Sequence, residues 1–359
     1  MSDILQEKDG MKSSGEGSSI LGGFDRREMM TAATLLPLLA VGHKASAATL
    51  SASGAGSKIA PSILDYLGNL DLAVQELAKT WKPDDPRYRA DLYRQIMMNL
   101  SYAYFVYFHA DPEHPDWAPF ENPVFADQPN PDTIYVYAPM RGDLTYRVSG
   151  NRGTCNSVVF CTAHGLMGTI DNMDEITDIN TFDMKGLKID ADGEFELIFS
   201  AKRPEGYTGN WAPIQASTNS LLVRYIMQDW IKERDPQLSI ECLDKVPPKR
   251  RLTPEEILER IPLMARVPAY MNRALYRMQN DIRKELGVNN FKLQELYGVK
   301  DFQTYWRAAY EFSPGEALVI ETDIPKGCPY WNLQLNDPLF NWTPRRTWVL
   351  RAAVRKRCR

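Results

Sequence analysis

Two stretches near the beginning of the chain have the spacing of helices. Between residues 61 and 81 apolar side chains recur at the helical period, which predicts a helix that begins at Pro61 and ends before Lys82-Pro83. A second helix over about residues 87–108 has apolar residues on several faces, which is typical of a helix buried in a core. We therefore expect the fold to begin with helices.

A third helix has the clearest start signal in the chain. Thr253 is an N-cap residue, Pro254 suits the first helical position, and Glu256 completes a capping box. The helical pattern continues to about residue 286, and we expect it to be broken near two internal prolines, Pro262 and Pro268.

From Pro112 onward the pattern changes to short β-rich runs, separated by turn signals such as Gly142 and Asp192-Gly193. The predicted strands cover residues 133–138, 144–148, 157–162, 186–190, 195–200 and 239–242, with closing strands at 317–322 and 331–335. Residues 219–230 suit a helix and a strand equally. Regular spacing of this kind is typical of an antiparallel sandwich or barrel.

Together these elements predict an α+β fold. Its core is an antiparallel, jelly-roll-like β-sandwich, with N-terminal helices and a helical insertion before the last strands. The expected segments are a flexible lead-in with helices at 48–111, the sandwich core at 112–245, the helical insertion at 246–300 and the closing strands at 301–341. Residues 1–47 and 342–359 flank this fold, and each has a composition of its own.

Residues 1–47 have the pattern of an export signal. Arg26-Arg27 stands just before the apolar run 29–41, and Ala45-Ser46-Ala47 is a small-residue cleavage site. The arginine pair favours the twin-arginine route. The run is shorter than the roughly 20 residues that a membrane-spanning helix needs, and no other segment is apolar enough. We therefore expect a periplasmic or secreted protein with no membrane span in the mature chain.

Charge narrows the classes of partner. The whole chain has a net charge of −4, but its last 18 residues hold six Arg, one Lys and no acidic residue, so residues 48–341 carry −10. We do not expect an acidic domain of this kind to bind nucleic acid.

Neither the cysteines nor the common motifs indicate a cofactor. The five cysteines are scattered, and buried free thiols fit them better than a hairpin bridge between Cys155 and Cys161. The sequence has no G-x-S-x-G elbow, Walker loop, dinucleotide glycine fingerprint or H-E-x-x-H. We therefore expect no cofactor.

One metal-like cluster, His109, Asp111 and His114, lies among prolines and fits a structural loop better than a metal site.

Candidate site residues lie around the predicted strand 133–138. Asp132 precedes this strand, and Tyr135 and Tyr137 share one of its faces, so a carboxylate beside two tyrosines is expected to anchor a ligand in an aromatic pocket. An Asx turn with packed tyrosines is the structural alternative.

Two charged residues, Arg224 and Asp229, stand in an apolar run, where a charge is costly unless it is paired. They suit a buried ion pair, and Arg224 also suits a clamp for a substrate carboxylate. His164 follows a predicted strand, where it faces a cavity or makes a structural contact.

Several stretches together resemble a family of bacterial proteins. They are residues 130–135 (Asn-Pro-Asp-Thr-Ile-Tyr), 142–150, 220–224, Asp229-Trp230 and 330–335. In this order they are similar to proteins that carry the domain of unknown function numbered 1214, over roughly residues 90–340. The resemblance implies a β-sandwich-like core with helical additions and names no reaction. The matching polar and aromatic positions are Asn130, Asp132, Tyr135, Tyr146, Arg147, Arg224, Asp229, Trp230, Trp331 and Asn332.

The likeness ends after Asn341, where members resembling this chain continue with a polar segment. The arginine-rich residues 342–359 that follow here have two explanations. A shifted reading frame would produce such an ending after an intact motif, and a true basic tail would bind anionic surfaces.

These observations predict an exported enzyme that acts on a hydrophobic or aromatic small molecule by cofactor-independent acid/base chemistry, as a lyase, isomerase or hydrolase. The expected catalytic residues are Asp132, Asp229 and Tyr135. The expected substrate-binding residues are Tyr137, Arg147, His164, Arg224, Trp230, Trp331 and Asn332. The alternative is a periplasmic small-molecule- or carbohydrate-binding module without catalysis, since aromatic residues form 11% of the chain and suit ligand stacking. An oligomer is compatible with either function.

Overall fold

Helices and three β-sheets make up the part of the chain that the computed structural model describes, residues 63–80, 86–121, 130–294, 303–323 and 327–336. The helices are α1 (Ile63–Leu67), α2 (Leu70–Thr80), α3 (Pro86–Tyr104) and α4 (Pro254–Leu286). The strands of the two larger sheets are β1 (Ala118–Phe120), β2 (Thr133–Pro139), β3 (Tyr146–Asn151), β4 (Ser157–His164), β5 (Thr177–Asp183), β6 (Glu194–Ser200), β7 (Asn210–Pro213), β8 (Ser220–Ile226) and β9 (Gln237–Cys242).

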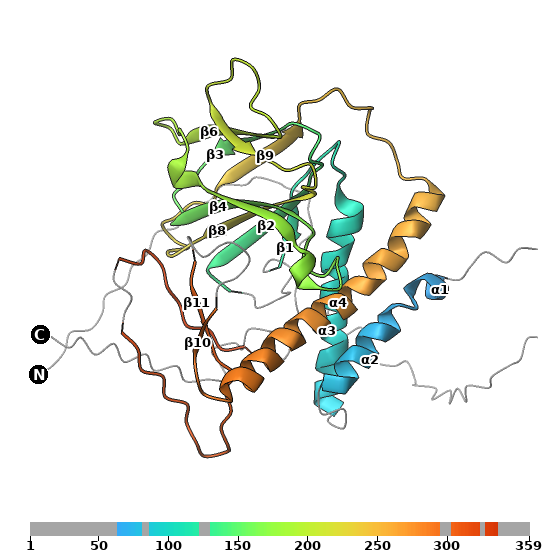
Figure 1. Cartoon of the computed structure of the whole chain (residues 1–359), viewed down its shortest axis with the longest axis vertical. Coiled ribbons are helices and arrows are strands. Elements are labelled where there is room, and N and C mark those ends of the chain that lie inside the picture. The colour runs from blue at the N-terminus through green and yellow to red at the C-terminus, as the bar shows by residue number, and fades with distance from the viewer. Residues whose placement is uncertain (1–62, 81–85, 122–129, 295–302, 324–326, 337–359) are drawn as a thin grey trace, which may run out of the picture. The chain divides into compact units, whose positions relative to one another are not determined.

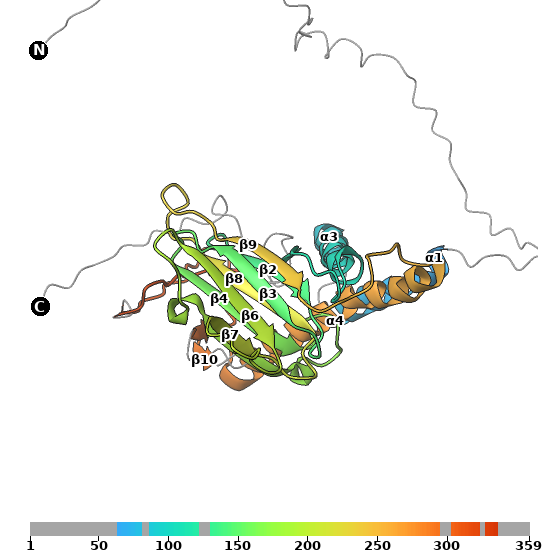
Figure 2. The same ribbon diagram turned by 90° about the horizontal axis from the view of Figure 1, so that it is seen from above.

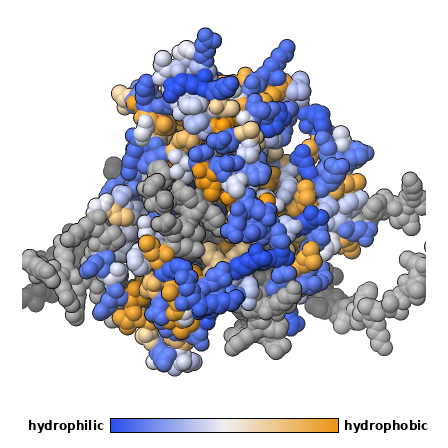
Figure 3. All heavy atoms as spheres, in the orientation of Figure 1, coloured by the Kyte–Doolittle hydropathy of each residue, from blue (hydrophilic) through white to orange (hydrophobic). Residues whose placement is uncertain are grey.

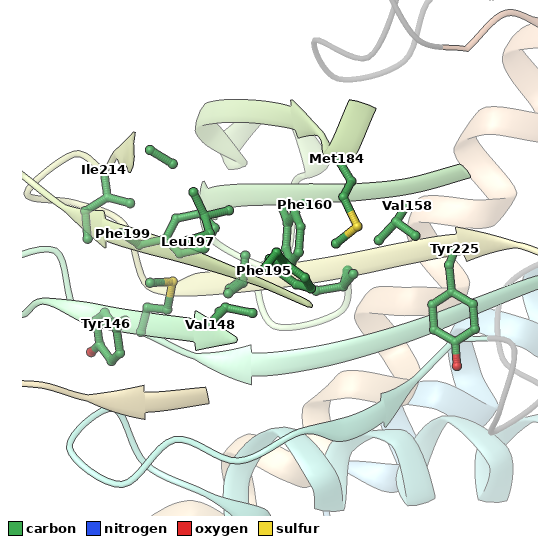
Figure 4. Packing of buried hydrophobic residues seen from close by; sticks show 14 of the residues in the cluster. Tyr146, Val148, Val158, Phe160, Met184, Phe195, Leu197, Phe199, Ile214 and Tyr225 are labelled. Carbon is green, nitrogen blue, oxygen red and sulfur yellow. The ribbon is translucent and has the colours of Figure 1, made fainter. Parts of the chain in front are cut away.

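The two larger sheets pack face to face as a sandwich (Figure 2). One has the strand order β1-β2-β8-β4-β5 and the other β7-β6-β3-β9. Between them lies a core of buried apolar side chains (Figure 4), in which the Phe160 ring is 6.2 Å from that of Phe195 and 6.0 Å from that of Phe199. This arrangement confirms the predicted α+β fold with a β-sandwich core.

The chain crosses repeatedly from one sheet to the other, since β2, β4 and β8 lie in one sheet and β3, β6 and β9 in the other. Neighbouring strands of the five-stranded sheet are antiparallel, as predicted. In the four-stranded sheet β6 and β7 run parallel, because residues 201–209 carry the chain back along β6 before β7 begins.

Strand β8 covers the stretch whose sequence suits a helix and a strand equally. Leu221, Val223 and Tyr225 are buried in the sandwich core, while Leu222 packs on the opposite side of the sheet. The strand form prevails because β8 lies between β2 and β4 and forms a ladder with each of them.

Helix α4 is one helix of 33 residues, so the expected breaks at Pro262 and Pro268 are wrong. Its start is as predicted, with the capping box between Thr253 and Glu256 in place. A proline inside a helix removes a backbone hydrogen bond, but tertiary contacts compensate here. Pro268 is buried, and the carbonyl oxygen of Pro262 accepts a hydrogen bond from Asn69 Nδ2 at 3.3 Å.

Helices α3 and α4 cover the outer side of the five-stranded sheet (Figure 1). Tyr102 of α3 and Val267 and Met271 of α4 pack against Phe120 of β1 and Tyr137 of β2. The helix predicted over residues 61–81 is two helices, α1 and α2, and both contact α4. The five-stranded sheet is therefore the central layer, with helices on one side and the second sheet on the other.

Three predicted strands are wrong. Residues 186–190 form no strand, and the chain instead pairs earlier as β5, Thr177–Asp183. The closing strands expected at 317–322 and 331–335 are also not formed; β10 (Lys292–Gln294) and β11 (Tyr305–Arg307) pair in a small sheet of their own. Apolar alternation is not enough for a strand, because its backbone groups need a partner strand.

Several sequence expectations fall on other parts of the chain. The export signal at 1–47 and the tail at 342–359 lie outside the described residues. Of the helices that the structure describes, none combines the length and apolarity that crossing a bilayer requires. Hydrophobic residues lie in separate patches among hydrophilic ones on the face shown in Figure 3. The described cysteines, Cys155, Cys161, Cys242 and Cys328, are free thiols.

Candidate functional site

Two tyrosines of β2 lie on the side of the sheet that faces the helices. Tyr135 and Tyr137 belong to the apolar cluster formed with α3 and α4, whereas Ile134 and Val136 pack into the sandwich core. This alternation confirms that the two tyrosines share one face. Tyr137 is only 6% exposed and serves as a packing residue. Tyr135 remains partly accessible.

Arg224 lies beside Tyr135, on the neighbouring strand β8. The two residues are register partners, and Arg224 Cζ is 5.9 Å from the centre of the Tyr135 ring. Among the residues that the structure describes, no carboxylate forms an ion pair with Arg224, and Asp229 is paired with Lys232 instead. The Glu121 carboxylate acts on Arg224 only at longer range. Of the two roles considered for Arg224, the buried pair with Asp229 is therefore wrong.

Tyr305, from the short strand β11, completes this group. It lies close enough to Arg224 for the guanidinium to influence its pKa, and Arg307 Cζ is 5.2 Å from the centre of the Tyr305 ring. The sequence analysis missed Tyr305 because no local pattern connects β11 with β8. We call Tyr135, Arg224 and Tyr305 the arginine–tyrosine site.

Burial keeps the phenols of the arginine–tyrosine site protonated. It raises the pKa of Tyr135 and of Tyr305 above the ordinary value, and the neighbouring Arg224 opposes this rise without cancelling it. At neutral pH both hydroxyls therefore carry a proton that they can donate, and the guanidinium is a donor throughout. These groups together are suited to hold an anion.

A second polar group surrounds Asp132 at the start of β2. The Tyr330 hydroxyl donates to Asp132 Oδ2 at 3.0 Å, and the amides of Asn130 and Asn332 donate to the same phenolic oxygen at 3.3 and 2.6 Å. A phenol has one proton to donate, so the two amide donors leave that proton directed at the carboxylate. We call these four residues the carboxylate–phenol site.

The environment of Tyr330 also keeps its proton in place. Burial raises the pKa of Tyr330 to about 12, and the negative charge of Asp132 adds to the rise, while Asn130 and Asn332 oppose it. The sequence analysis named Asp132 and Asn332 but missed Tyr330. The one signal that could have found it is its position beside Trp331-Asn332, within one of the stretches on which the predicted resemblance to the 1214 family rests.

The two sites lie toward the same end of β2 and β8. Met227 N donates to Asp132 O at 2.8 Å, and the pair of Tyr135 with Arg224 is three residues further along each strand. Three residues of strand span about 10 Å. The two sites are therefore about 10 Å apart along the backbone of the sheet.

The segment that carries Tyr330 has no strand, but polar contacts fix it at the end of the sandwich. The Pro329 carbonyl oxygen accepts a hydrogen bond from Asn156 Nδ2 at 3.3 Å and another from Gln228 Nε2. Asn156 immediately precedes β4 and Gln228 follows β8. Tyr330 thus reaches Asp132 from a part of the chain some 200 residues away.

Asp229 belongs to a turn of its own. Its Oδ1 accepts hydrogen bonds from the backbone N–H groups of Ile231 and Lys232 at 3.1 and 3.2 Å, and its Oδ2 pairs with Lys232 at 3.1 Å. Lys232, followed by the backbone contacts, lowers the pKa of Asp229. These local contacts include neither Asp132 nor Arg224, so the structure does not place Asp229 in either site.

Two tryptophans predicted to bind substrate are accessible. Trp230 is 48% exposed and Trp331 is 47% exposed. Each lies within two residues of the hydrogen bond that joins Gln228 to Pro329. They therefore lie on two segments that meet at this end of the sandwich.

Arg147 and His164 make contacts elsewhere. Arg147 lies on the outer side of the four-stranded sheet, where it pairs with Glu241 at 2.5 Å and with Glu196 at 3.5 Å on the two neighbouring strands. His164 is exposed at the end of β4, and its Nδ1 is 2.9 Å from Ser217 O. The structure brings neither residue to the arginine–tyrosine site or the carboxylate–phenol site.

The metal-like loop is a turn. Asp111 Oδ1 accepts hydrogen bonds from the backbone N–H groups of Glu113 and His114 at 3.0 and 2.9 Å, while His109 Nε2 lies 3.1 Å from Trp117 O. Within the described ranges, no group of three or more His, Cys, Asp and Glu side chains is arranged to hold a metal ion.

Comparison with known proteins gives a fold likeness and no function. No model of a protein family matches the chain, and neither does any curated protein. The chain is similar to the crystal structure of an uncharacterized protein from Burkholderia cenocepacia, with a TM-score of 0.57 and 27% identity over 64% of this chain and 62% of that one. The match thus spans less than two thirds of that protein.

A second match is weaker. The VPA0106 protein from Vibrio parahaemolyticus has a TM-score of 0.26 and 13% identity, over 54% of this chain and 46% of that one. Neither name states an activity. The resemblance to the 1214 family stays a prediction.

Proposed function

We propose that this chain is an exported enzyme that acts on a hydrophobic or aromatic small molecule by cofactor-independent acid/base chemistry, as a lyase, isomerase or hydrolase. The observation that carries the proposal is the 3.0 Å hydrogen bond from the Tyr330 hydroxyl to Asp132 Oδ2. A carboxylate held by a phenol, three residues along β2 from the pair of Tyr135 with Arg224, has the parts that proton transfer to or from a bound molecule requires.

Asp132 is the proposed general base. Its carboxylate takes a proton from the substrate, and Tyr330 holds that carboxylate in position through the hydroxyl that Asn130 and Asn332 orient. Because the pKa of Tyr330 is raised to about 12, its hydroxyl stays a donor at neutral pH and stabilises the negative charge that develops on the substrate as Asp132 takes the proton.

The arginine–tyrosine site is the proposed substrate-binding part. Tyr135, which the sequence analysis placed among the catalytic residues, lies beside Arg224 and is assigned here to binding. Its ring lies 6.5 Å from that of Phe120, within the apolar cluster under α3 and α4. An aromatic or hydrophobic substrate would pack against this surface.

Loss of turnover in two variants tests the enzyme proposal. The protein is first incubated with a panel of terpenoid, steroid, aromatic and glycosidic compounds, and mass spectrometry shows which compound is converted. That compound then serves as the substrate for the variants. We expect Asp132→Asn to lower kcat by about 100-fold or more and Tyr330→Phe by about tenfold, since general-base catalysis contributes this much. Asp143→Asn, an exposed carboxylate paired with Arg141, is the matched control.

Full turnover by Asp132→Asn would contradict the proposal. Asp229→Asn decides between the two carboxylates that the sequence suggested, and we expect it to keep its turnover because Lys232 and its own turn occupy its oxygens.

A binding module without catalysis is the second candidate. The exposed Trp230 and Trp331, on two segments that meet at Pro329, favour it, because such rings stack on sugars and other flat ligands. Recovery of a bound compound unchanged after long incubation would support the module over the enzyme.

A further inference from the structure

The arginine–tyrosine site contains a cation with no anion against it. Arg224 is only partly exposed, yet no carboxylate in the described residues lies within ion-pair distance of its guanidinium. Arg147, in the other large sheet, differs, since it has two carboxylates beside it. A guanidinium that gives up part of its hydration without a counter-charge is costly, so the position calls for an anionic ligand.

The residues around Arg224 also favour an anionic ligand. Tyr135 and Tyr305 bring hydroxyl groups to the guanidinium, and Arg307 adds a second positive charge over the Tyr305 ring at 5.2 Å. The Glu121 carboxylate acts at longer range on both Arg224 and Tyr305. Within the described part of the chain, the groups in contact with the Arg224 guanidinium are therefore aromatic and hydroxyl groups, not a carboxylate.

The surroundings also define the shape of the ligand. The Tyr135 ring lies 6.5 Å from Phe120 and Arg224 Cζ 5.9 Å from Tyr135, so the polar donors stand directly beside aromatic faces. Leu222, partly accessible on the same side of the sheet, extends the apolar surface, while Phe120 and Tyr137 are buried. A small inorganic anion would use only the donors and leave this aromatic surface unused.

We infer that the arginine–tyrosine site binds the carboxylate group of an aromatic carboxylic acid. The planar guanidinium of Arg224 pairs with both carboxylate oxygens, as its fork geometry favours, and the hydroxyls of Tyr135 and Tyr305 donate to the same group. The ring of the ligand packs against the Tyr135 ring and Leu222, which are partly accessible on this side of the sheet. The inference rests on the proposed function, since it names the class of substrate for that enzyme.

Direct binding tests this inference without turnover. Fluorine NMR compares 4-fluorobenzoate with its neutral analogue 4-fluorobenzamide on the full chain. We expect the acid to bind at least about tenfold more tightly than the amide, because hydrogen bonds to charged groups are the stronger ones. In Arg224→Gln this preference should disappear, and in Arg224→Lys it should be weaker. Arg147→Gln is the control, since Arg147 lies on the outer side of the other sheet.

Tyr305→Phe is a second test variant, which is needed if the Arg224 variants do not fold. It removes one hydroxyl from the small β10–β11 sheet and should weaken binding of the acid by about threefold to tenfold, with the amide unaffected. Thermal unfolding of each variant is recorded beside the binding curves.

Equal affinity for acid and amide would overturn the inference. So would an unchanged preference in a folded Arg224→Gln, or tighter binding of inorganic phosphate than of 4-fluorobenzoate. The enzyme proposal fails separately. We expect Asp132→Asn to bind the acid as the wild type does. If the acid binds through Arg224 and Asp132→Asn keeps full turnover, the ligand class stands and the assignment of Asp132 as general base is wrong.

Discussion

Some single polar side chains hold the framework of the sandwich together. Tyr146 is fully buried, and its hydroxyl accepts a hydrogen bond from Arg141 N at 2.8 Å and donates to Pro112 O at 3.0 Å. This one side chain therefore ties the segment that leaves the helices to the start of β3. Asn130 has a comparable role, because it accepts from Asp132 N at 3.0 Å and donates to Tyr330. Such residues position the site without meeting a ligand.

Gly142 occupies a position where the backbone packs too closely for any side chain. A Cβ atom at this position would lie 2.0 Å from Gln215 O and 2.6 Å from the Ala216 carbonyl group, so the backbone there would have to move. We expect Gly142→Ala to lower the free energy of unfolding by about 1–3 kcal/mol. Urea denaturation measures this change.

Gly186→Ala is the control for that experiment, because a Cβ at Gly186 would meet nothing within 4 Å. Its effect should stay within about 0.5 kcal/mol. Equal stability of the two variants would contradict this prediction. It would mean that the backbone at Gln215 moves to make room for the added Cβ at little cost in free energy.

Among the elements, α4 joins the helical layer to the sandwich. Arg273, near its middle, pairs with Glu76 of α2 at 3.3 Å and also with Asp171, in the loop after β4. Asn272 accepts a hydrogen bond from Asn99 of α3 at 3.2 Å, and buried Gln95 of α3 donates to Asn99 at 3.4 Å. These contacts, together with its buried residues, hold α4 as one helix although it contains two prolines.

The start of α4 carries a pH-dependent contribution to stability. Glu256 accepts two hydrogen bonds from Arg250, at 2.7 and 2.6 Å, and one from Thr253 N at 2.7 Å. Chiefly through Arg250, these contacts lower the pKa of Glu256 from 4.5 to about 2. Because the pKa is lowered in the folded state, the contribution is present above about pH 4.5 and is lost as the pH falls toward 2.

Glu256→Gln should therefore destabilise the protein at neutral pH, and the difference from wild type should shrink as the pH falls from about 7 to about 3. Urea midpoints measured across this range check the expectation. Glu255→Gln, the neighbouring glutamate in the same helical turn, is the matched control. A difference that stays constant with pH would contradict the assigned cause.

At the scale of the whole molecule, the five-stranded sheet separates two regions with different chemistry. Its inner side closes a sandwich core of apolar side chains such as Phe160 and Leu221. Its outer side meets the helices through a cluster that contains Tyr135, and Arg224 of β8 lies beside that tyrosine. The helical layer therefore encloses the proposed binding surface, and the sandwich supplies a rigid base for it.

The proposed export of the protein can also be tested. If residues 1–47 direct export by the twin-arginine route, the protein recovered from the periplasm of a bacterial host should begin near Ala48, which N-terminal sequencing can measure. Changing Arg26 and Arg27 together to Lys should leave the precursor in the cytoplasm. A protein that keeps its first 47 residues in the periplasm, or that is exported equally well without the arginine pair, would contradict this proposal.

Much of the framework could be predicted because its causes are local. The capping box of α4 depends on residues three positions apart, and the shared face of Tyr135 and Tyr137 follows from the two-residue repeat of a strand. The position of Asp132 at the end of the sheet was also predictable, since it directly precedes an alternating strand, while its role in a site stays a prediction. The strands expected at 317–322 and 331–335 failed because nothing local reveals whether a partner strand exists.

The sequence by itself determined the α+β class, the sandwich core and the β2 residues of the site, because periodicity, caps and turns act over a few residues. Tertiary structure decided the rest. It made β8 a strand, kept α4 intact and paired Asp229 with Lys232. It also left Arg224 without an ion pair among the described residues, and brought Tyr305 and Tyr330 to the sheet. The physical reason is that burial and pairing depend on groups far apart along the chain, which only the folded chain brings into contact.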